Sequence, residues 1–272
     1  MSRPVHAVID LRALHNNVVV ARRHAGDARL IAVVKADAYG HGLANVLPAL
    51  GDTDAIAVVE FESAVFARAR GYGKPIVLLE GFFSPGELSR FSELSLTAVI
   101  YQREQVEMLR VARLKRVIDV HVKLNSGMNR LGFRPDELAA VVAALRASGN
   151  VGEITAMTHF ADADGKHGIE WQLERFNAAA AAQGLPSSMA NSAALLRYPQ
   201  ARGSWVRPGI MLYGASPFAE LTANSLSLQP VMTLQSRIIA IQDLAPGDTV
   251  GYSRTYTARK AMRIGVVACG YG

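Results

Sequence analysis

Two lysines stand directly after short apolar runs and could act as nucleophilic amines. Lys35 follows the run Leu30–Val34, and Lys123 ends the similar strand-like sequence Ile-Asp-Val-His-Val-Lys, residues 118–123. A lysine at the end of a buried strand is partly desolvated, which favours the neutral amine and its attack on an aldehyde. Residues 36–42 form a loop with glycines that would let a ligand approach closely. Such a lysine can also simply extend to solvent, and the local pattern does not choose between the two.

A second group of residues could bind an anion. Asn191 and Ser192 follow the seventh apolar run and precede a helical pattern, and Arg207, Gly209 and Ile210 lie within the eighth. In β/α barrels, phosphate sites commonly lie after strands seven and eight, where backbone N–H groups are free. Asn191 on its own is better explained as a helix cap. The coincidence of the two segments strengthens the phosphate interpretation, and at this point both it and the capping interpretation stay open.

Other candidate residues carry weaker local signals. His159 follows the sixth apolar run and could contact a ligand, although a histidine buried in the core is the alternative. Tyr252 lies in the β-like stretch 249–256, where an exposed tyrosine on an alternating strand is the simpler interpretation. The histidines have no metal-binding spacing, and Asp162 with Asp164 indicates a surface turn without the later ligands of a calcium loop. We therefore expect no metal site.

The elements that must position these residues are short apolar runs separated by amphipathic stretches. Such runs are typical of buried parallel strands, and the alternation predicts an α/β fold, an N-terminal (β/α)8 barrel. A doubly wound open sheet is the alternative, because periodicity cannot distinguish a closed sheet from an open one. The predicted strands are Leu30–Val34, Ala55–Val59, Pro75–Leu79, Leu96–Ile100, Ile118–Leu124, Val151–Thr158, Ser188–Ala190 and Trp205–Leu212.

The pattern changes after residue 224, so we expect a barrel over residues 1–224 and the start of a β domain over 225–272. Strand patterns over Val231–Ile241, Val250–Thr257 and Met262–Ala268 follow one another without a helix. So few strands would bury little core, and we expect this C-terminal β domain to be truncated.

The amino-acid composition excludes several classes of protein. Half of the 272 residues are hydrophobic and 19% are charged, which is enough to bury a sizeable core. The net charge is +6, but the Lys and Arg residues are dispersed, so we expect no nucleic-acid partner. Because Cys269 is the single cysteine in the sequence, no intrachain disulfide can form. We expect Cys269 to be buried. With no signal-peptide pattern and no long apolar stretch, we expect a cytoplasmic protein without a membrane partner.

Taken together, these motifs resemble the alanine racemase family along the whole chain. The most specific is residues 32–42, Ala-Val-Val-Lys-Ala-Asp-Ala-Tyr-Gly-His-Gly, which is similar to the family's cofactor-lysine signature. Residues 123–132, 157–161, 190–192, 207–210 and 250–252 match further family motifs in the same order. Asn125 stands where many members of the family have Asp. The resemblance implies a homodimer with shared active sites and pyridoxal 5'-phosphate as the cofactor.

The resemblance also implies a role for each candidate residue. Lys35 would hold the cofactor as a Schiff base and Tyr252, from the partner subunit, would be the second catalytic base, so that L- and D-alanine are interconverted by two bases for peptidoglycan metabolism. Lys123 matches a lysine that is often carbamylated, which would orient Arg130. Arg130 would contact the cofactor's phenolic oxygen and the substrate carboxylate. Arg207 would face the pyridine nitrogen with His159 behind it, and the remaining cofactor contacts would be Tyr39, Asn191, Ser192, Gly209 and Ile210.

Three other functions are compatible with parts of the pattern. A cofactor-carrying barrel without racemase activity would lack the β segment and Tyr252, both of which are present. A barrel amino-acid decarboxylase usually has a cysteine opposite the cofactor and an acidic residue at the pyridine nitrogen, so Arg207 and the single Cys269 disfavour it. A broad-specificity racemase is disfavoured by the lack of a signal peptide.

Overall fold

The computed structural model describes residues 3–270, and contacts divide the chain into two units. The larger unit is Asp10–Val231, and the smaller unit combines the segment that ends at Ile9 with the segment that begins at Met232. The sequence pattern placed a boundary after residue 224 and assigned the N-terminal residues to the barrel, whereas the contacts group the N-terminal strand with the C-terminal segment.

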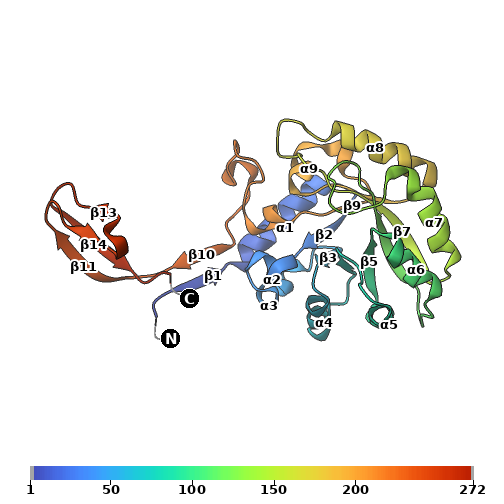
Figure 1. The fold of residues 1–272 in the computed structure, drawn as a ribbon, viewed down its shortest axis with the longest axis horizontal. Coiled ribbons are helices and arrows are strands. Elements are labelled where there is room, and N and C mark those ends of the chain that lie inside the picture. The colour runs from blue at the N-terminus through green and yellow to red at the C-terminus, as the bar shows by residue number, and fades with distance from the viewer. Residues whose placement is uncertain (1–2, 271–272) are drawn as a thin grey trace. The chain divides into compact units, whose positions relative to one another are not determined.

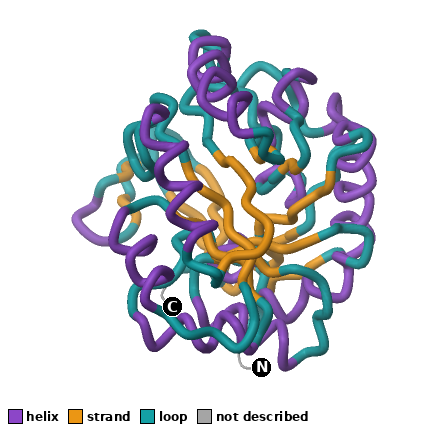
Figure 2. Tube along the Cα trace, turned by 90° about the vertical axis from the view of Figure 1, so that its right-hand side faces the viewer, coloured by secondary structure: helices purple, strands orange, loops and turns teal. Residues whose placement is uncertain are grey.

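The larger unit is a closed barrel of parallel strands, with the strands at the centre and helices around them (Figures 1 and 2). Closure comes from pairing of the first barrel strand with the last, through Arg29 with Trp205 and Leu30 with Val206. The predicted barrel is therefore confirmed and the open sheet is wrong. The barrel strands are β2 (Arg29–Val33), β3 (Ala55–Val58), β4 (Ile76–Leu78), β5 (Leu96–Ile100), β6 (Ile118–Lys123), β7 (Val151–Met157), β8 (Ser187–Ser188) and β9 (Trp205–Val206).

Buried apolar side chains explain why these short runs form strands. Residues pointing into the barrel fill its centre, as expected for a packed barrel core. The cluster consists of Ile31, Val33, Ala55, Ala57, Val77, Val99, Met157 and Trp205, with Leu79 packed against it. The polar side chains that follow the strands are thereby placed at one end of the barrel, because parallel strands all end on the same side.

Helices cover the outside of the barrel. Asp10 begins the first helix by accepting hydrogen bonds from the backbone N–H groups of Arg12 and Ala13, at 2.8 and 3.1 Å. The helices are α1 (Leu11–Ala25), α3 (Leu43–Val46), α4 (Phe61–Ala69), α5 (Pro85–Glu93), α6 (Arg103–Val111), α7 (Leu138–Ala147), α8 (Glu170–Ala180) and α9 (Ser192–Arg197), with 3-10 turns η1 (Leu47–Leu50), η2 (Pro135–Glu137), η3 (Ala181–Gln183), η4 (Pro199–Ala201), η5 (Ile210–Tyr213) and η6 (Asn224–Leu226). The segment labelled α2 (Lys35–Tyr39) is not an ordinary α-helix, because residues 36–39 have left-handed backbone angles.

The last two barrel strands are shorter than predicted. The run Trp205–Leu212 forms a strand only over Trp205–Val206, because Pro208 has no N–H to donate and the chain turns into η5 (Ile210–Tyr213). The run Ser188–Ala190 forms a two-residue strand one position earlier, at Ser187–Ser188. Early termination leaves residues 189–191 after β8 and residues 207–209 after β9 to form loops at the end of the barrel.

The smaller unit is built from two-stranded antiparallel pairs. β1 (His6–Ile9) pairs with β10 (Met232–Gln235), β11 (Ile238–Leu244) with β14 (Met262–Val267), and β12 (Thr249–Val250) with β13 (Tyr256–Thr257). The prediction of one strand over Val250–Thr257 is wrong, because η7 (Tyr252–Arg254) interrupts it. The run Val231–Ile241 likewise forms two strands rather than one.

Three further expectations can be compared with the structure. Cys269 is exposed rather than buried, because it lies beyond the end of β14. Over residues 3–270, no three or more His, Cys, Asp or Glu side chains are grouped so that they could hold a metal ion. No helix within the same range is both long and apolar enough to cross a membrane.

Candidate active site

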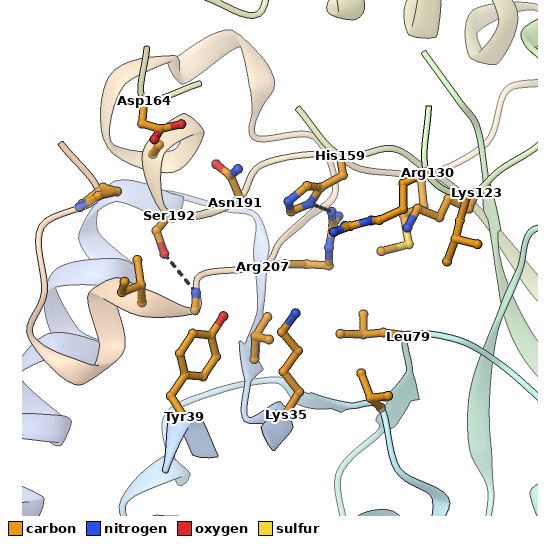
Figure 3. Close-up of a pocket in the computed structure, with 18 of the residues that line it drawn as sticks. Lys35, Tyr39, Leu79, Lys123, Arg130, His159, Asp164, Asn191, Ser192 and Arg207 are labelled. Atoms are coloured by element: carbon orange, nitrogen blue, oxygen red, sulfur yellow. Dashed lines mark hydrogen bonds between the residues drawn. The ribbon is translucent and has the colours of Figure 1, made fainter. Parts of the chain in front are cut away.

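A cavity of about 480 Å³ lies at the end of the barrel where the strands terminate, and its lining belongs to the larger unit. Ten residues singled out from the sequence line it: Lys35, Tyr39, Lys123, Arg130, His159, Asn191, Ser192, Arg207, Gly209 and Ile210. The structure thus brings together side chains from both ends of the barrel sequence (Figure 3). The cavity lining has more cationic than anionic side chains, since it contains four Lys or Arg residues against two carboxylates.

Lys35 is followed by an unusual left-handed turn. Ala36, Asp37, Ala38 and Tyr39 all have φ values between 49° and 57°. For residues other than glycine, this conformation costs about 1–2 kcal/mol each. The side chain of Asp37 stabilises the turn by accepting a hydrogen bond of 2.7 Å from the N–H of Leu43. The turn directs the Lys35 amine and the Tyr39 hydroxyl toward the segments that carry Ser192 and Arg207 (Figure 3).

Tyr213 supports this turn and was missed by the sequence analysis. Its ring stacks on Tyr39 with 4.8 Å between centroids and contacts the ring of His41 at 4.6 Å. Its hydroxyl donates a hydrogen bond of 3.1 Å to the carbonyl of Val33, two residues before Lys35. Burial raises the pKa of Tyr213, so the hydroxyl keeps its proton. The only signal in the sequence was a tyrosine within an apolar stretch before Gly214.

Arg207 is a buried cation held by oxygen acceptors. Only 4% of it is exposed, and it donates hydrogen bonds of 2.7 Å to both the Ser188 hydroxyl and the Thr158 carbonyl. Burial lowers the pKa of Arg207 to about 10, which still leaves the guanidinium charged at neutral pH. Its Nη2 lies 3.5 Å from Nδ1 of His159. A guanidinium only donates, so Nδ1 must be unprotonated if it is to accept.

His159 is expected to be neutral. Burial, followed by the charge of Arg207, lowers the pKa of His159 to about 3. The side chain lies two residues beyond the end of β7 rather than on its last position. Of the two neighbouring side chains at this wall of the cavity, Arg207 is therefore charged and His159 is neutral.

Lys123 lies among other cations. It is 7% exposed, and burial together with Arg207 and Arg130 lowers the pKa of Lys123 to about 8, with Glu80 acting in the opposite direction. Glu80 itself lines the cavity and was missed, although it follows β4 as Lys35 follows β2. Asp164, expected on a surface turn, also lines the cavity. These two carboxylates partly balance the cationic charge.

Ser192 joins the two segments predicted to bind an anion. Its hydroxyl oxygen accepts a hydrogen bond from the N–H of Gly209 at 2.9 Å (Figure 3). It also accepts one from the N–H of Met211 at 3.3 Å. Asn191 caps α9 by accepting from Ala194 N–H at 2.9 Å, which confirms the capping interpretation. The N–H of Ile210 begins a 3-10 turn and has no acceptor within that turn.

Tyr252 belongs to the smaller unit. It lies in η7, and 88% of it is exposed. The residues that line the barrel cavity all belong to the larger unit. A role for Tyr252 at the site therefore rests on the family resemblance.

A closed β/α barrel with a lysine after a strand and a cationic cavity is typical of barrel enzymes that use a lysine amine in the active site. Comparison with known proteins is more specific. The family model for the alanine racemase N-terminal domain matches residues 9–217, and that for the C-terminal domain matches 231–272. The chain therefore belongs to the alanine racemase family, which is a family of isomerases.

Individual relatives are similar over the full chain. An alanine racemase of Nitrosospira multiformis is 50% identical over 274 residues, covering 100% of this chain and 77% of that protein. The solved biosynthetic alanine racemase of Pseudomonas aeruginosa superposes with a TM-score of 0.94 at 43% identity, covering 99% of this chain and 76% of the other. The alanine racemase of Acinetobacter baumannii superposes with a TM-score of 0.92 at 37% identity, with coverages of 99% and 76%.

Proposed function

We propose that this protein interconverts L- and D-alanine with pyridoxal 5'-phosphate held in the barrel cavity by Lys35, and that the D-alanine serves peptidoglycan metabolism. The observation that supports this most is the convergence of Lys35, Arg207 and Ser192 on one cavity. The names of the relatives support alanine as the substrate. Bound pyridoxal phosphate supplies an electron-accepting ring that acidifies the Cα–H of an amino acid joined to it.

The residues present fit this cofactor. Lys35 provides an amine for its aldehyde, and the cavity is cationic, as an anionic phosphate requires. The Tyr39 hydroxyl and the N–H of Ile210 are the groups we assign to the phosphate, beside Ser192 and the cap residue Asn191. Gly209 has no side chain and leaves room for Tyr39, since a β-carbon built on it would lie 2.6 Å from the Tyr39 oxygen.

Arg207 provides a charged donor for the pyridine nitrogen. Because the guanidinium stays protonated, it would donate a hydrogen bond without giving up a proton. An acidic residue in its place would favour a protonated ring nitrogen. We therefore infer that Arg207, with His159 behind it, keeps the ring nitrogen unprotonated and so makes the cofactor a weaker electron acceptor. This would favour return of a proton to the substrate Cα over side reactions.

The proton transfers need a base on each face of the substrate carbon. We assign Lys35 to the face used by D-alanine and Tyr252 of a partner subunit to the face used by L-alanine. Arg130 would bind the substrate carboxylate and the phenolic oxygen, oriented by Lys123 in carbamate form. Two copies of the chain would then form a homodimer with shared sites.

The proposal is tested with purified protein supplied with pyridoxal phosphate. Incubation with L-alanine should yield D-alanine, measured by chiral chromatography, until the two enantiomers are equal. Borohydride reduction followed by peptide mapping should place the cofactor on Lys35. Attachment to Lys123, or no D-alanine from cofactor-loaded protein, would contradict the proposal.

A further inference from the structure

Gln172 is a buried amide that lies outside the cavity but next to two of its walls. It belongs to α8 and its exposed fraction is 0%. Its Nε2 donates hydrogen bonds of 3.2 Å to both the Ser126 hydroxyl and the His159 carbonyl, and its Oε1 accepts one of 2.7 Å from the N–H of Ala161. Both N–H donors and the carbonyl are therefore used.

The hydrogen bonds beyond Gln172 have only one possible direction. The Thr158 hydroxyl donates its single proton to the Leu124 carbonyl at 3.0 Å. It must therefore accept in its 2.8 Å contact with the Ser126 hydroxyl, which donates there. The Ser126 oxygen is then free to accept from Gln172, as the geometry requires. Donation runs from Gln172 through Ser126 and Thr158 to Leu124.

This chain of hydrogen bonds joins two loops that carry candidate site residues. Ser126 lies in the loop Leu124–Phe133, which also carries Arg130. Thr158 accepts from Arg207 through its carbonyl at 2.7 Å and is followed by His159. Ser126 and Thr158 are each 1% exposed, so water cannot readily replace a lost partner. The relative position of the two loops therefore depends on the donors of Gln172.

We propose that Gln172 is a positioning residue that keeps the Arg130 loop and the segment bearing His159 in a single arrangement. It does not touch the cavity and acts only through Ser126, the His159 carbonyl and Ala161. The inference rests on the proposed function for its kinetic readout, whereas its structural readout is independent of any reaction.

The most discriminating variant is Gln172→Glu, which keeps the shape but removes both N–H donors. The carboxylate would face the His159 carbonyl and would draw the Ser126 proton away from Thr158. We expect kcat/KM for alanine to fall at least about tenfold at pH 8, the equivalent of about 1.4 kcal/mol. A buried carboxyl has a raised pKa, so lowering the pH should restore one donor. The ratio of variant to wild-type kcat/KM should therefore rise as the pH falls.

Asn150 provides the matched control. It is also a buried amide, 8% exposed, and donates to the carbonyls of Leu109 and Ala112, both at 2.9 Å. It precedes β7 and so lies at the opposite end of that strand from His159. Asn150→Asp should lower the free energy of unfolding, but its ratio of kcat/KM to the wild-type value should not depend on pH.

Hydrogen–deuterium exchange gives the readout that does not require activity. In Gln172→Met, peptides covering residues 124–133 and 158–163 should exchange faster than in the wild type, while Asn150→Ala should leave both unchanged. If the Gln172 variants do not fold, Ser126→Ala removes one link and should accelerate exchange in the same two peptides. Wild-type exchange in both peptides, or a pH-independent kcat/KM ratio for Gln172→Glu, would overturn the proposal. An inactive wild type would instead contradict the proposed function and leave the exchange result decisive for Gln172.

Discussion

A β-carbon added to Gly209 would lie 2.6 Å from the hydroxyl oxygen of Tyr39 and 3.3 Å from its Cζ. The Tyr39 ring cannot easily move, because it stacks on Tyr213 and its own backbone is left-handed. The two residues therefore fit only if position 209 has no side chain.

Gly209→Ala should consequently displace Tyr39. Overpacking of this kind costs about 1–3 kcal/mol, and we expect the Kd for pyridoxal phosphate to rise at least about tenfold. Fluorescence titration of the cofactor-free protein measures the Kd. Tyr39→Phe removes the nearest atom, so Gly209→Ala should raise the Kd by a smaller factor in the Tyr39→Phe background than in the wild type. An unchanged Kd in Gly209→Ala would show that the ring is free to move.

Tyr213 allows stacking and hydrogen bonding to be separated. Tyr213→Phe loses only the hydrogen bond to Val33, which is worth about 0.5–1.5 kcal/mol, whereas Tyr213→Leu also loses the stack on Tyr39. Urea unfolding should show the larger loss of stability for Tyr213→Leu, and only this variant should bind the cofactor substantially more weakly. Equal stability of the two variants would exclude a supporting role for the stack.

Carbamylation of Lys123 remains a prediction. Because the pKa of Lys123 is lowered to about 8, a substantial fraction of its amine is neutral at pH 8 and able to add carbon dioxide. A carbamate would also replace repulsion from the nearby Arg130 by attraction. With 13C-labelled bicarbonate, the wild type should show a carbamate NMR signal that grows from pH 7 to 8. Lys35→Ala should retain this signal and Lys123→Met should lose it; persistence in Lys123→Met would refute the assignment.

His121 should make the protein less stable in acid. It is 4% exposed, and burial, followed by Arg207 and Arg29, lowers the pKa of His121 from 6.5 to about 3. Between these values the unfolded chain binds a proton that the folded chain does not, so the free energy of unfolding falls as the pH drops. His121→Phe should reduce this slope by up to about 1.4 kcal/mol per pH unit.

Urea unfolding at pH 7 and pH 5 measures the effect of His121→Phe. The exposed His167, changed to Gln, serves as the control and should preserve the wild-type dependence on pH. The same slope in His121→Phe and the wild type would mean that His121 takes up its proton without unfolding.

Sharing of the site between subunits can be tested by mixing inactive variants. Lys35 belongs to the larger unit and Tyr252 to the smaller one, and both Lys35→Ala and Tyr252→Phe should be nearly inactive alone. In a symmetric dimer with shared sites, the heterodimer contains one intact site and should recover up to about half of the wild-type activity. Mass spectrometry of differently tagged chains checks subunit exchange. A mixture that exchanges but stays inactive would rule out shared sites.

The sequence alone determined the class of fold and most of the barrel cavity. Apolar runs of strand length alternating with amphipathic stretches indicate which segments are buried, because burial shapes the local pattern of each segment. The polar residues within or after those runs predicted several of the side chains that meet, such as Lys35, Ser192 and Arg207, whereas Tyr39 and Arg130 were predicted only from the family resemblance. The same local pattern could not choose between Lys35 and Lys123, because both end similar runs; only the resemblance to a family did so. It also missed Glu80, although that residue follows a strand in the same way.

Only the tertiary structure showed that the sheet closes into a barrel and which residues support the loops of the site. The pairing of Arg29 with Trp205 closes the sheet by joining the first and last barrel strands, which lie far apart in the sequence. The local hydrophobic periodicity of these strands does not predict this pairing. The left-handed turn after Lys35 is held by Tyr213, far along the chain, against its own backbone preference. Gln172 looks like an ordinary helical residue until its amide meets Ser126 and His159. Contacts of this kind join residues that are distant in sequence. Because they do not affect the local hydrophobic periodicity of either segment, the sequence pattern cannot reveal them.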